Sequence, residues 1–286
     1  MTSRQLIQAS NVHYTYDEGT RAVEALRGID LYVNAGDFVA IVGHNGSGKS
    51  TLAKCLNGLL VPTKGDVWVG GQNTRHGSER ALLEIRATVG IVFQHPENQF
   101  VATTVREEVA FGPENLGVPT QELHRRIARA LRDVGLQGLE GRNPHDLSAG
   151  QKSRLAIASM LAMEPQCLIL DESTAMLDPI ARRNVLALLD DLHDRGLTLI
   201  LITHSMDEAV LADRVVVLDR GRVALEGSPQ SVFADQKIFD ELGLDLPVSA
   251  AIARELQQRG LYLPGKAILT ENDLIEALIE RVQIET

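Results

Sequence analysis

Apolar and polar residues follow two different rhythms along this chain. Short apolar runs of strand length occur at 38–42, 89–93, 167–170, 197–202 and 215–218. Between them, segments such as 51–60 and 179–195 carry apolar residues at helical spacing. Apolar strands that alternate with helices predict an α/β domain with a mostly parallel sheet, covered by helices on both faces.

Two regions depart from this alternation. Residues 4–33 contain short strand patterns broken by turn residues, and 66–69 resembles one arm of a hairpin, so an N-terminal antiparallel β region is expected. Helical periodicity at 104–111, 120–134 and 148–163 predicts a helical insert at about 95–165.

The pattern changes again near residue 235. A connector at 243–247 precedes two amphipathic segments, at about 248–259 and 271–283. We therefore predict one large domain over 1–235 and a small helical C-terminal extension over 236–286.

Composition agrees with this division and narrows the function. A chain of 286 residues with 44% hydrophobic residues can form one large core and a small appendage. Its formal net charge of −10 argues against nucleic acid as the main partner. Cys55 and Cys167 lie in apolar surroundings, which favours buried free thiols over a disulfide.

Nothing in the pattern indicates a membrane span or a targeting segment. The N-terminus lacks an apolar stretch of signal-peptide length, and apolar runs such as 199–202 are too short to cross a bilayer. We expect a cytosolic chain whose membrane role comes through a partner.

A glycine-rich segment between the 38–42 strand and the next helix carries the first chemical signal. It fits G-x-x-x-x-G-K-[ST], the phosphate-binding P-loop. We expect ATP to be bound by the eight residues of this motif and by the residue that follows it: Gly43, His44, Asn45, Gly46, Ser47, Gly48, Lys49, Ser50 and Thr51. Glycines let backbone N–H groups surround an anion, and the helix N-terminus adds partial positive charge. Lys49 is expected to reach the β- and γ-phosphates, and the Ser50 hydroxyl to bind Mg²⁺.

Two carboxylates end the strand at 167–170. Asp171 is placed to hold Mg²⁺, directly or through water, and Glu172 to polarise an attacking water. A solvated pair at a strand end is the alternative, and the upstream P-loop makes it much the weaker one.

The segment Leu147-Ser148-Ala149-Gly150-Gln151 opens a helix. Ser148 and Gln151 fit a capping box, and the same helix N-terminus could instead face a γ-phosphate. The segment resembles the signature L-S-G-G-Q of ATP-binding-cassette (ABC) ATPases, from which Ala149 departs. If Ser148 is the N-cap, Ala149 takes a negative φ, so its Cβ costs little backbone energy, although it could crowd the phosphate.

The resemblance implies further site residues, in the family's order along the chain. Residues 173–178 resemble the D-loop, which crosses to the partner subunit and ends at Asp178. His204 resembles the switch histidine that contacts the γ-phosphate, and Gln94 the Q-loop glutamine that touches Mg²⁺ and senses the membrane partner. Tyr16 lies where the family stacks an aromatic ring on adenine, with Tyr14 as the competing candidate.

A narrower resemblance is carried by two segments. Residues 93–100, Phe-Gln-His-Pro-Glu-Asn-Gln-Phe, and 173–179, Ser-Thr-Ala-Met-Leu-Asp-Pro, are similar to the ATPase subunits of energy-coupling-factor (ECF) importers of the cobalt and vitamin types. The C-terminal extension resembles the dimerising extension of that group.

Together these observations predict a P-loop NTPase of ABC type that hydrolyses ATP with Mg²⁺ and powers micronutrient uptake through separate membrane subunits. Two such subunits, identical or paralogous, would face each other head to tail, peripheral to the cytoplasmic face of the membrane. Residues Ser148 to Gln151 would then act on the partner's ATP, while Lys49, Glu172 and His204 catalyse hydrolysis.

Other ABC importers, and ABC ATPases of DNA repair or translation, are the alternatives. The repair class places a long coiled coil between P-loop and signature, whereas only about a hundred residues without sustained heptads separate them here. The translation class has two cassettes, whereas this sequence has one P-loop and one signature.

Overall fold

The computed structural model describes residues 4–17, 19, 22–234, 236–263 and 267–285. The strands are β1 (Gln5–Asp17), β2 (Ala22–Asn34), β3 (Phe38–Val42), β4 (Lys64–Val69), β5 (Gln72–Asn73), β6 (Val89–Val92), β7 (Cys167–Asp171), β8 (Thr198–Ile202), β9 (Arg214–Asp219) and β10 (Arg222–Gly227). The helices are α1 (Lys49–Leu56), α2 (Glu79–Thr88), α3 (Val105–Asn115), α4 (Thr120–Asp133), α5 (Ala149–Leu161), α6 (Pro179–Asp194), α7 (Met206–Ala209), α8 (Pro229–Ala234), α9 (Gln236–Leu242), α10 (Val248–Gln258) and α11 (Glu271–Glu285). Short 3₁₀ helices are η1 (Pro96–Asn98) and η2 (Pro144–Asp146).

The larger sheet carries the α/β part of the fold. Its order is β10-β9-β3-β8-β7-β6, with the strands from β9 to β6 parallel and β10 antiparallel at one edge. Side chains alternate between its two faces: Ala40 and Val42 of β3 join the core beneath the helices α3 to α6, and Val39 and Ile41 join the core on the opposite face. Both faces are therefore buried, as the continuous apolar runs predicted.

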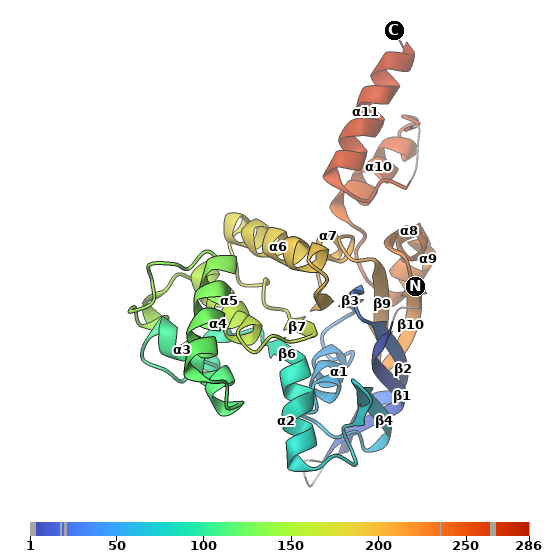
Figure 1. The fold of residues 1–286 in the computed structure, drawn as a ribbon. Helices are drawn as coiled ribbons and strands as arrows, with labels where there is room; N and C mark the ends of the chain where they lie inside the picture. Colours follow the sequence, from blue (N-terminus) through green and yellow to red (C-terminus); the bar gives the residue numbers. More distant parts are fainter. Residues whose placement is uncertain (1–3, 18, 20–21, 235, 264–266, 286) are drawn as a thin grey trace.

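The smaller sheet is antiparallel, with order β2-β1-β4-β5. The predicted antiparallel region is therefore confirmed, but 5–17 forms one strand with irregular register rather than two short ones. Its apolar side chains pack with α1 onto the larger sheet, on the face opposite the helical insert (Figure 1). Cys55 and Cys167 are free and buried in this core, as predicted, and burial raises the pKa of the Cys55 thiol to about 12.

The helices α3, α4 and α5 pack together beside the larger sheet (Figure 1). The helices α4 and α5 lie within predicted helical segments of the insert, and α3 extends four residues beyond its predicted segment at 104–111. Three helices were not predicted: α2, α8 and α9. Of these, α9 places Phe239 in the large core, where its ring lies 5.3 Å from that of Phe233.

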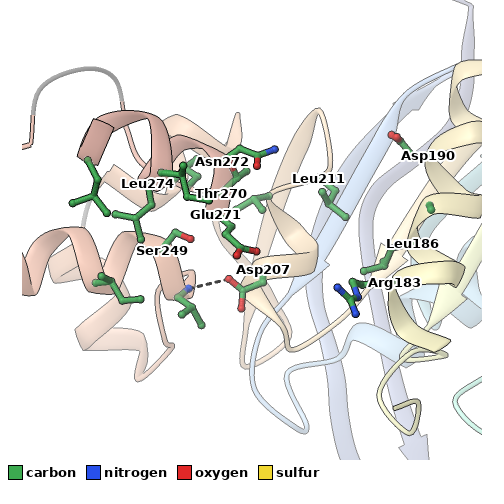
Figure 2. A pocket seen from close by; sticks show the side chains of 17 residues that line it. Arg183, Leu186, Asp190, Asp207, Leu211, Ser249, Thr270, Glu271, Asn272 and Leu274 are labelled. Carbon is green, nitrogen blue, oxygen red and sulfur yellow. Dashed lines mark hydrogen bonds between the residues drawn. The ribbon is translucent and has the colours of Figure 1, made fainter. Parts of the chain in front are cut away.

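The helices α10 and α11 project from the body of the molecule, close to their predicted bounds (Figure 1). They form a separate small core around Ala253, Leu263, Leu274 and Ala277. Asp207 of α7 ties them to the body, because its carboxylate accepts a hydrogen bond from the Val248 N–H at 2.9 Å (Figure 2). The domain boundary predicted between residues 235 and 236 falls next to residue 235, and residue 235 lies outside the described residues.

A groove of about 930 Å³ separates this extension from the body, and Figure 2 shows its lining side chains. It lies between α6 and α7 on one side and α10 and α11 on the other. Leu186, Leu211, Ile252 and Ile275 give it a largely apolar lining. None of the helices in the described parts of the chain combines the length and hydropathy that a bilayer crossing requires.

Candidate functional site

Three neighbouring parallel strands bring the candidate site together. β3, β8 and β7 are adjacent in the sheet, so their carboxyl ends lie at one edge. The P-loop follows β3, His204 follows β8, and Asp171 and Glu172 end β7. Parallel pairing therefore places side chains more than 150 residues apart in sequence beside one another, at the edge where α/β sheets bind ligands.

The P-loop has the backbone of an anion site. Gly43 and Gly48 have φ of 146° and 105°, in the region that favours glycine. A Cβ on Gly43 would lie 2.2 Å from the carbonyl oxygen of Leu218, so this position admits only glycine. Gly48 is the N-cap of α1 and supplies no side-chain acceptor, which leaves the N–H groups of the first turn available to a phosphate.

Lys49 lies buried across this loop. Its ammonium donates hydrogen bonds to the carbonyls of Gly43 at 2.7 Å and His44 at 3.0 Å, and its Nζ lies 3.7 Å from Glu172 Oε1. Burial lowers the pKa of Lys49, and the neighbouring carboxylates partly oppose that shift. The ammonium is held at the loop by neutral carbonyl oxygens, so it can turn to the charged oxygens of a bound phosphate, with which it forms stronger hydrogen bonds.

Ser50 and Asp171 form a pair of oxygen ligands beside the P-loop. The Ser50 hydroxyl donates to Asp171 Oδ1 at 3.0 Å, and Asp171 is only 5% exposed. Burial is the main cause that raises the pKa of Asp171. The buried Ser47 hydroxyl, in the same loop, has no hydrogen-bond partner among the described residues. A desolvated carboxylate and hydroxyls suit a hard divalent cation with a phosphate, so the residues fit Mg²⁺ and ATP.

Glu172 and His204 face each other next to this pair. Glu172 has φ of 51°, which is uncommon for a residue with a side chain, and its N–H donates to the Ile202 carbonyl at 2.9 Å. His204 Nδ1 lies 3.9 Å from Glu172 Oε2. The strained backbone thus turns the Glu172 carboxylate toward both Lys49 and His204.

A cavity of about 350 Å³ opens on these groups. Its lining includes Gln94 from the end of β6, His44 and Asn45 from the P-loop, and Glu172 and His204. The structure therefore gathers the predicted P-loop, Q-loop, carboxylate and switch residues around one space.

Tyr16 lies near the C-terminal end of β1. Its hydroxyl is 3.2 Å from Thr51 Oγ1. Tyr14 contacts Tyr16 edge-to-face, with ring centroids 4.8 Å apart, but packs against the core, and burial raises the pKa of its phenol. Of the two tyrosines, Tyr16 is the one whose hydroxyl lies within hydrogen-bond distance of the P-loop helix in the described structure.

The signature residues lie elsewhere. Ser148 is the N-cap of α5 and makes the predicted capping box with Gln151, at 3.3 and 3.0 Å. Ala149 is the first helical residue, as expected. A Cβ on Gly150 would lie 2.8 Å from the Cβ of Ala181, so glycine permits the close approach of α5 to α6. Ser148, Gly150 and Gln151 line a second cavity, whereas Ala149 lines a third one with Gln94.

Asp178 also lines the second cavity, at the start of α6. Its carboxylate accepts hydrogen bonds from the N–H groups of Ile180 and Ala181, both at 2.9 Å, and so caps the helix. The predicted D-loop residue therefore has a local structural role as well as its position beside the signature.

Sequence reasoning missed a buried polar cluster that flanks the site. Glu208 of α7 is 3% exposed and accepts hydrogen bonds from the hydroxyls of Thr174 and Thr203. Neither threonine belongs to a periodic pattern. The signal in the sequence was weak: Glu208 is one of two acidic residues in a four-residue helix, four positions after His204.

Comparison with known proteins agrees with this geometry. Residues 26–175 match the family described as ABC transporter. The chain belongs to the ABC transporter family.

Among curated relatives, the chain is similar to energy-coupling factor transporter ATP-binding proteins EcfA1. It is 48% identical to that of Caldanaerobacter subterraneus subsp. tengcongensis over 95% of this chain and 98% of the relative. It is 51% identical to that of Symbiobacterium thermophilum, over 96% of each chain.

Solved structures give the same relationship. The structure of cbiO1 from Clostridium perfringens, part of the ABC transporter complex cbiONQ, has a TM-score of 0.74 at 37% identity and covers 89% of this chain and 99% of its own. The dimeric ATP-binding cassette MJ0796 bound to ADP and Pi has a TM-score of 0.71 at 29% identity, covering 78% and 99%. The chain is thus an ABC-type ATP-binding subunit that hydrolyses ATP in support of transport, as the sequence predicted.

Proposed function

We propose that this chain is the ATPase subunit of an ECF-type importer that takes up a micronutrient, a vitamin or a transition-metal ion. The hydrolytic part of the proposal rests on Glu172, which lines one cavity with His204 and lies 3.7 Å from Lys49, and on the adjacent Ser50–Asp171 hydrogen bond. The similarity to EcfA1 proteins over nearly the whole chain supports the ECF part. Another ABC importer is the alternative function.

Each residue has a role that follows from its position. The backbone from Gly43 to Thr51 holds the phosphates, and Lys49 leaves its loop carbonyls to bind the β- and γ-phosphate oxygens. Tyr16, at the Thr51 end of the loop, stacks on adenine. Glu172 accepts a proton from the attacking water, and His204 orients the γ-phosphate.

Ser50, Asp171 and Gln94 are the residues that would hold Mg²⁺. When bound, that ion neutralises charge on the β- and γ-phosphates. The same ion would offset the cost of the buried Asp171 charge.

The second half of the site comes from another subunit. Ser148, Gly150 and Gln151 open onto a cavity that the P-loop residues do not line, which supports a head-to-tail pairing with an identical chain or a paralogue. The dimeric form of MJ0796 is a precedent for a dimer of ATP-binding cassettes. The two subunits would sit at the cytoplasmic face of the membrane, on integral membrane subunits that select the solute.

The small core of α10 and α11 supports a separate unit at the C-terminal end of the predicted 236–286 extension. Because Phe239 of α9 packs in the large core, we place the start of this unit near residue 247, and Ala250 and Leu269 join it to that core. We propose that the unit contributes to dimerisation.

One variant tests the hydrolytic assignment. Glu172→Gln keeps the size of the side chain and removes its basicity, so ATP turnover should fall by roughly 10²–10⁴-fold while ATP binding is retained. Phosphate release and nucleotide binding are measured on the same preparation. Near-normal turnover would refute the role of Glu172.

The transport assignment needs a separate experiment. Affinity capture of the tagged full chain from membranes, followed by identification of the bound proteins, should recover integral membrane subunits and a second ATPase. Recovery of ribosomes or DNA-repair proteins instead would contradict the proposal.

A further inference from the structure

A buried carboxylate, that of Glu208, joins the two loops that carry the proposed catalytic groups Glu172 and His204. Glu208 Oε1 and Oε2 accept hydrogen bonds from Thr174 Oγ1 at 2.9 and 3.0 Å, and Oε2 accepts a further one from Thr203 Oγ1 at 2.7 Å. All three residues are at most 3% exposed. A charge so far from water is tolerated only when it has strong partners, so these hydroxyls are fixed in direction.

Each hydroxyl fixes a catalytic loop. Thr203 directly precedes His204, and its Oγ1 also accepts the N–H of Ser205 at 3.0 Å. The hydroxyl therefore closes a tight turn with His204 at its centre. Through its donated hydrogen bond, that turn is anchored to Glu208.

Thr174 performs the corresponding task on the other loop. It lies two residues after Glu172, in the turn where the Ala175 N–H donates to the Glu172 carbonyl at 3.1 Å. Glu172 has a left-handed backbone that needs support from its surroundings. A hydrogen bond from Thr174 to Glu208 supplies support from an element packed against the turn.

One further charge faces the cluster. Arg182 of α6 places Nε 3.7 Å from Glu208 Oε1. The carboxylate thus links four parts of the chain: the segment after β7, the segment after β8, α6 and α7.

We propose that Glu208 is a positioning residue that sets Glu172 and His204 in register for ATP hydrolysis. In the described part of the chain its carboxylate forms no hydrogen bond or ion pair with either of them, and it acts through the Thr174 and Thr203 hydroxyls. This inference rests on the proposed roles of Glu172 and His204.

Valine variants remove the hydroxyls at nearly constant shape. Thr174→Val and Thr203→Val should each lower kcat by about tenfold or more, because the two catalytic groups lose their common anchor, while the Kd for ATP changes by less than about twofold. Thr174→Ser and Thr203→Ser keep the hydroxyls and should keep kcat within about threefold of the parent protein. The full-length chain is assayed by phosphate release and by fluorescent-nucleotide binding.

A double variant tests the link itself. If both hydroxyls act through Glu208, Thr174→Val combined with Thr203→Val should lower kcat by much less than the product of the single effects. Independent loops would instead give the full product, and that result would overturn the proposal.

Glu108 provides a matched control. It is also buried, at 6% exposure, and its carboxylate accepts hydrogen bonds from the N–H groups of Val101 and Ala102, both at 2.9 Å, in the helical insert. Glu108→Gln should lower Tm without a selective loss of kcat. If the threonine variants lower Tm as much as Glu108→Gln does and leave kcat unchanged, Glu208 is merely structural.

Glu172→Gln, assayed in parallel, separates the two proposals. If it abolishes turnover while the valine variants turn over normally, the catalytic assignment stands and the positioning role fails. If it turns over normally, the catalytic assignment fails and the positioning role falls with it.

Discussion

At the scale of single residues, Asp171 shows that the candidate site lowers the stability of the folded protein. It is buried beside the P-loop, with a hydrogen bond from Ser50 and the charge of Lys49 nearby. Despite both, burial holds the pKa of Asp171 above its ordinary value of 3.8. Such a carboxylate is arranged for a ligand rather than for stability.

Asp171→Asn should therefore stabilise the protein in a chelator at neutral pH and abolish Mg²⁺-dependent hydrolysis. The wild-type carboxyl binds its proton more tightly when folded, so ionisation costs folding free energy as pH rises from about 3.8 through the folded pKa. The gain should be full at neutral pH and vanish in acid. A gain of about 1 kcal/mol would raise Tm by roughly 2–4 °C. Thermal scans with EDTA at several pH values measure it, and a pH-independent difference would contradict the explanation.

Ala149 and Gly150 are neighbours with opposite demands. Ala149 has helical backbone at the first position of α5, where a Cβ costs little. We expect Ala149→Gly to change the ATPase rate by less than tenfold, which corresponds to about 1.4 kcal/mol. A larger change in steady-state phosphate release would mean that the methyl group adjusts the phosphate contact.

Gly150→Ala should be far more damaging, because its methyl carbon would lie 2.8 Å from the Cβ of Ala181 and force α5 from α6. Overpacking of this kind costs roughly 1–3 kcal/mol, and denaturant unfolding measures the loss. Gly141→Ala is the matched control, since nothing lies within 4 Å of the added carbon and its φ is not positive. Adding Ala181→Gly should restore stability to the Gly150→Ala variant, and failure to do so would exclude this contact as the cause.

At the scale of elements, the buried strands and most of the helices were predictable, whereas α2, α8 and α9 were not. The runs that became β3, β7 and β8 are continuous and apolar because both faces of the sheet are covered, which leaves a strong signal. By contrast, α2 buries only Ile85 fully, so only a narrow part of its surface had to be apolar. Its signal was local: Ser78 accepts the Ala81 N–H and caps the helix.

The candidate site divides in the same way. Motif spacing predicted the P-loop, Asp171 and Glu172, and the family resemblance added His204. Each of them follows or ends a strand that the apolar pattern can locate. The bond of Thr174 to Glu208 joins residues 34 apart through tertiary packing, and no local pattern encodes it. The polar residues Thr174, Thr203 and Glu208 can be recognised as a cluster only when the structure shows that they are buried together.

Two helix caps allow the role of Asp178 to be tested. Asp178 caps α6, and Thr104 caps α3 with an equivalent hydrogen bond and a capping box. Either residue replaced by alanine should lose about 0.5–2 kcal/mol of stability. We expect Asp178→Ala to lower ATPase activity several-fold more than Thr104→Ala, because Asp178 also lies beside the signature residues. If the Asp178→Ala and Thr104→Ala variants have equal stability and equal ATPase activity, Asp178 acts only as a helix cap.

At the scale of the whole molecule, the P-loop and the signature open onto different cavities, so one chain holds two halves of a site that it does not close by itself. Hydrolysis should therefore depend on association. In a pair of identical or paralogous subunits, each ATP would contact the P-loop of one subunit and Ser148 of the other.

The ATPase rate per subunit should rise with protein concentration until dimers or complexes saturate. Sedimentation of the same samples gives the oligomeric state at each concentration. A rate per subunit that stays constant down to a demonstrated monomer would contradict a shared site.

Mixing two inactive variants tests whether the P-loop of one subunit works with the signature of the other. Lys49→Ala removes the P-loop cation, and Ser148→Arg blocks the signature while leaving the P-loop intact. In a mixed dimer, one of the two sites combines an intact P-loop with an intact signature, so equal mixing should restore up to about a quarter of the wild-type rate if the subunits pair at random. Each variant alone should stay inactive at any concentration. Absence of recovery, with mixed dimers demonstrated by differently tagged chains, would show that the signature at Ser148 does not complete the partner's site.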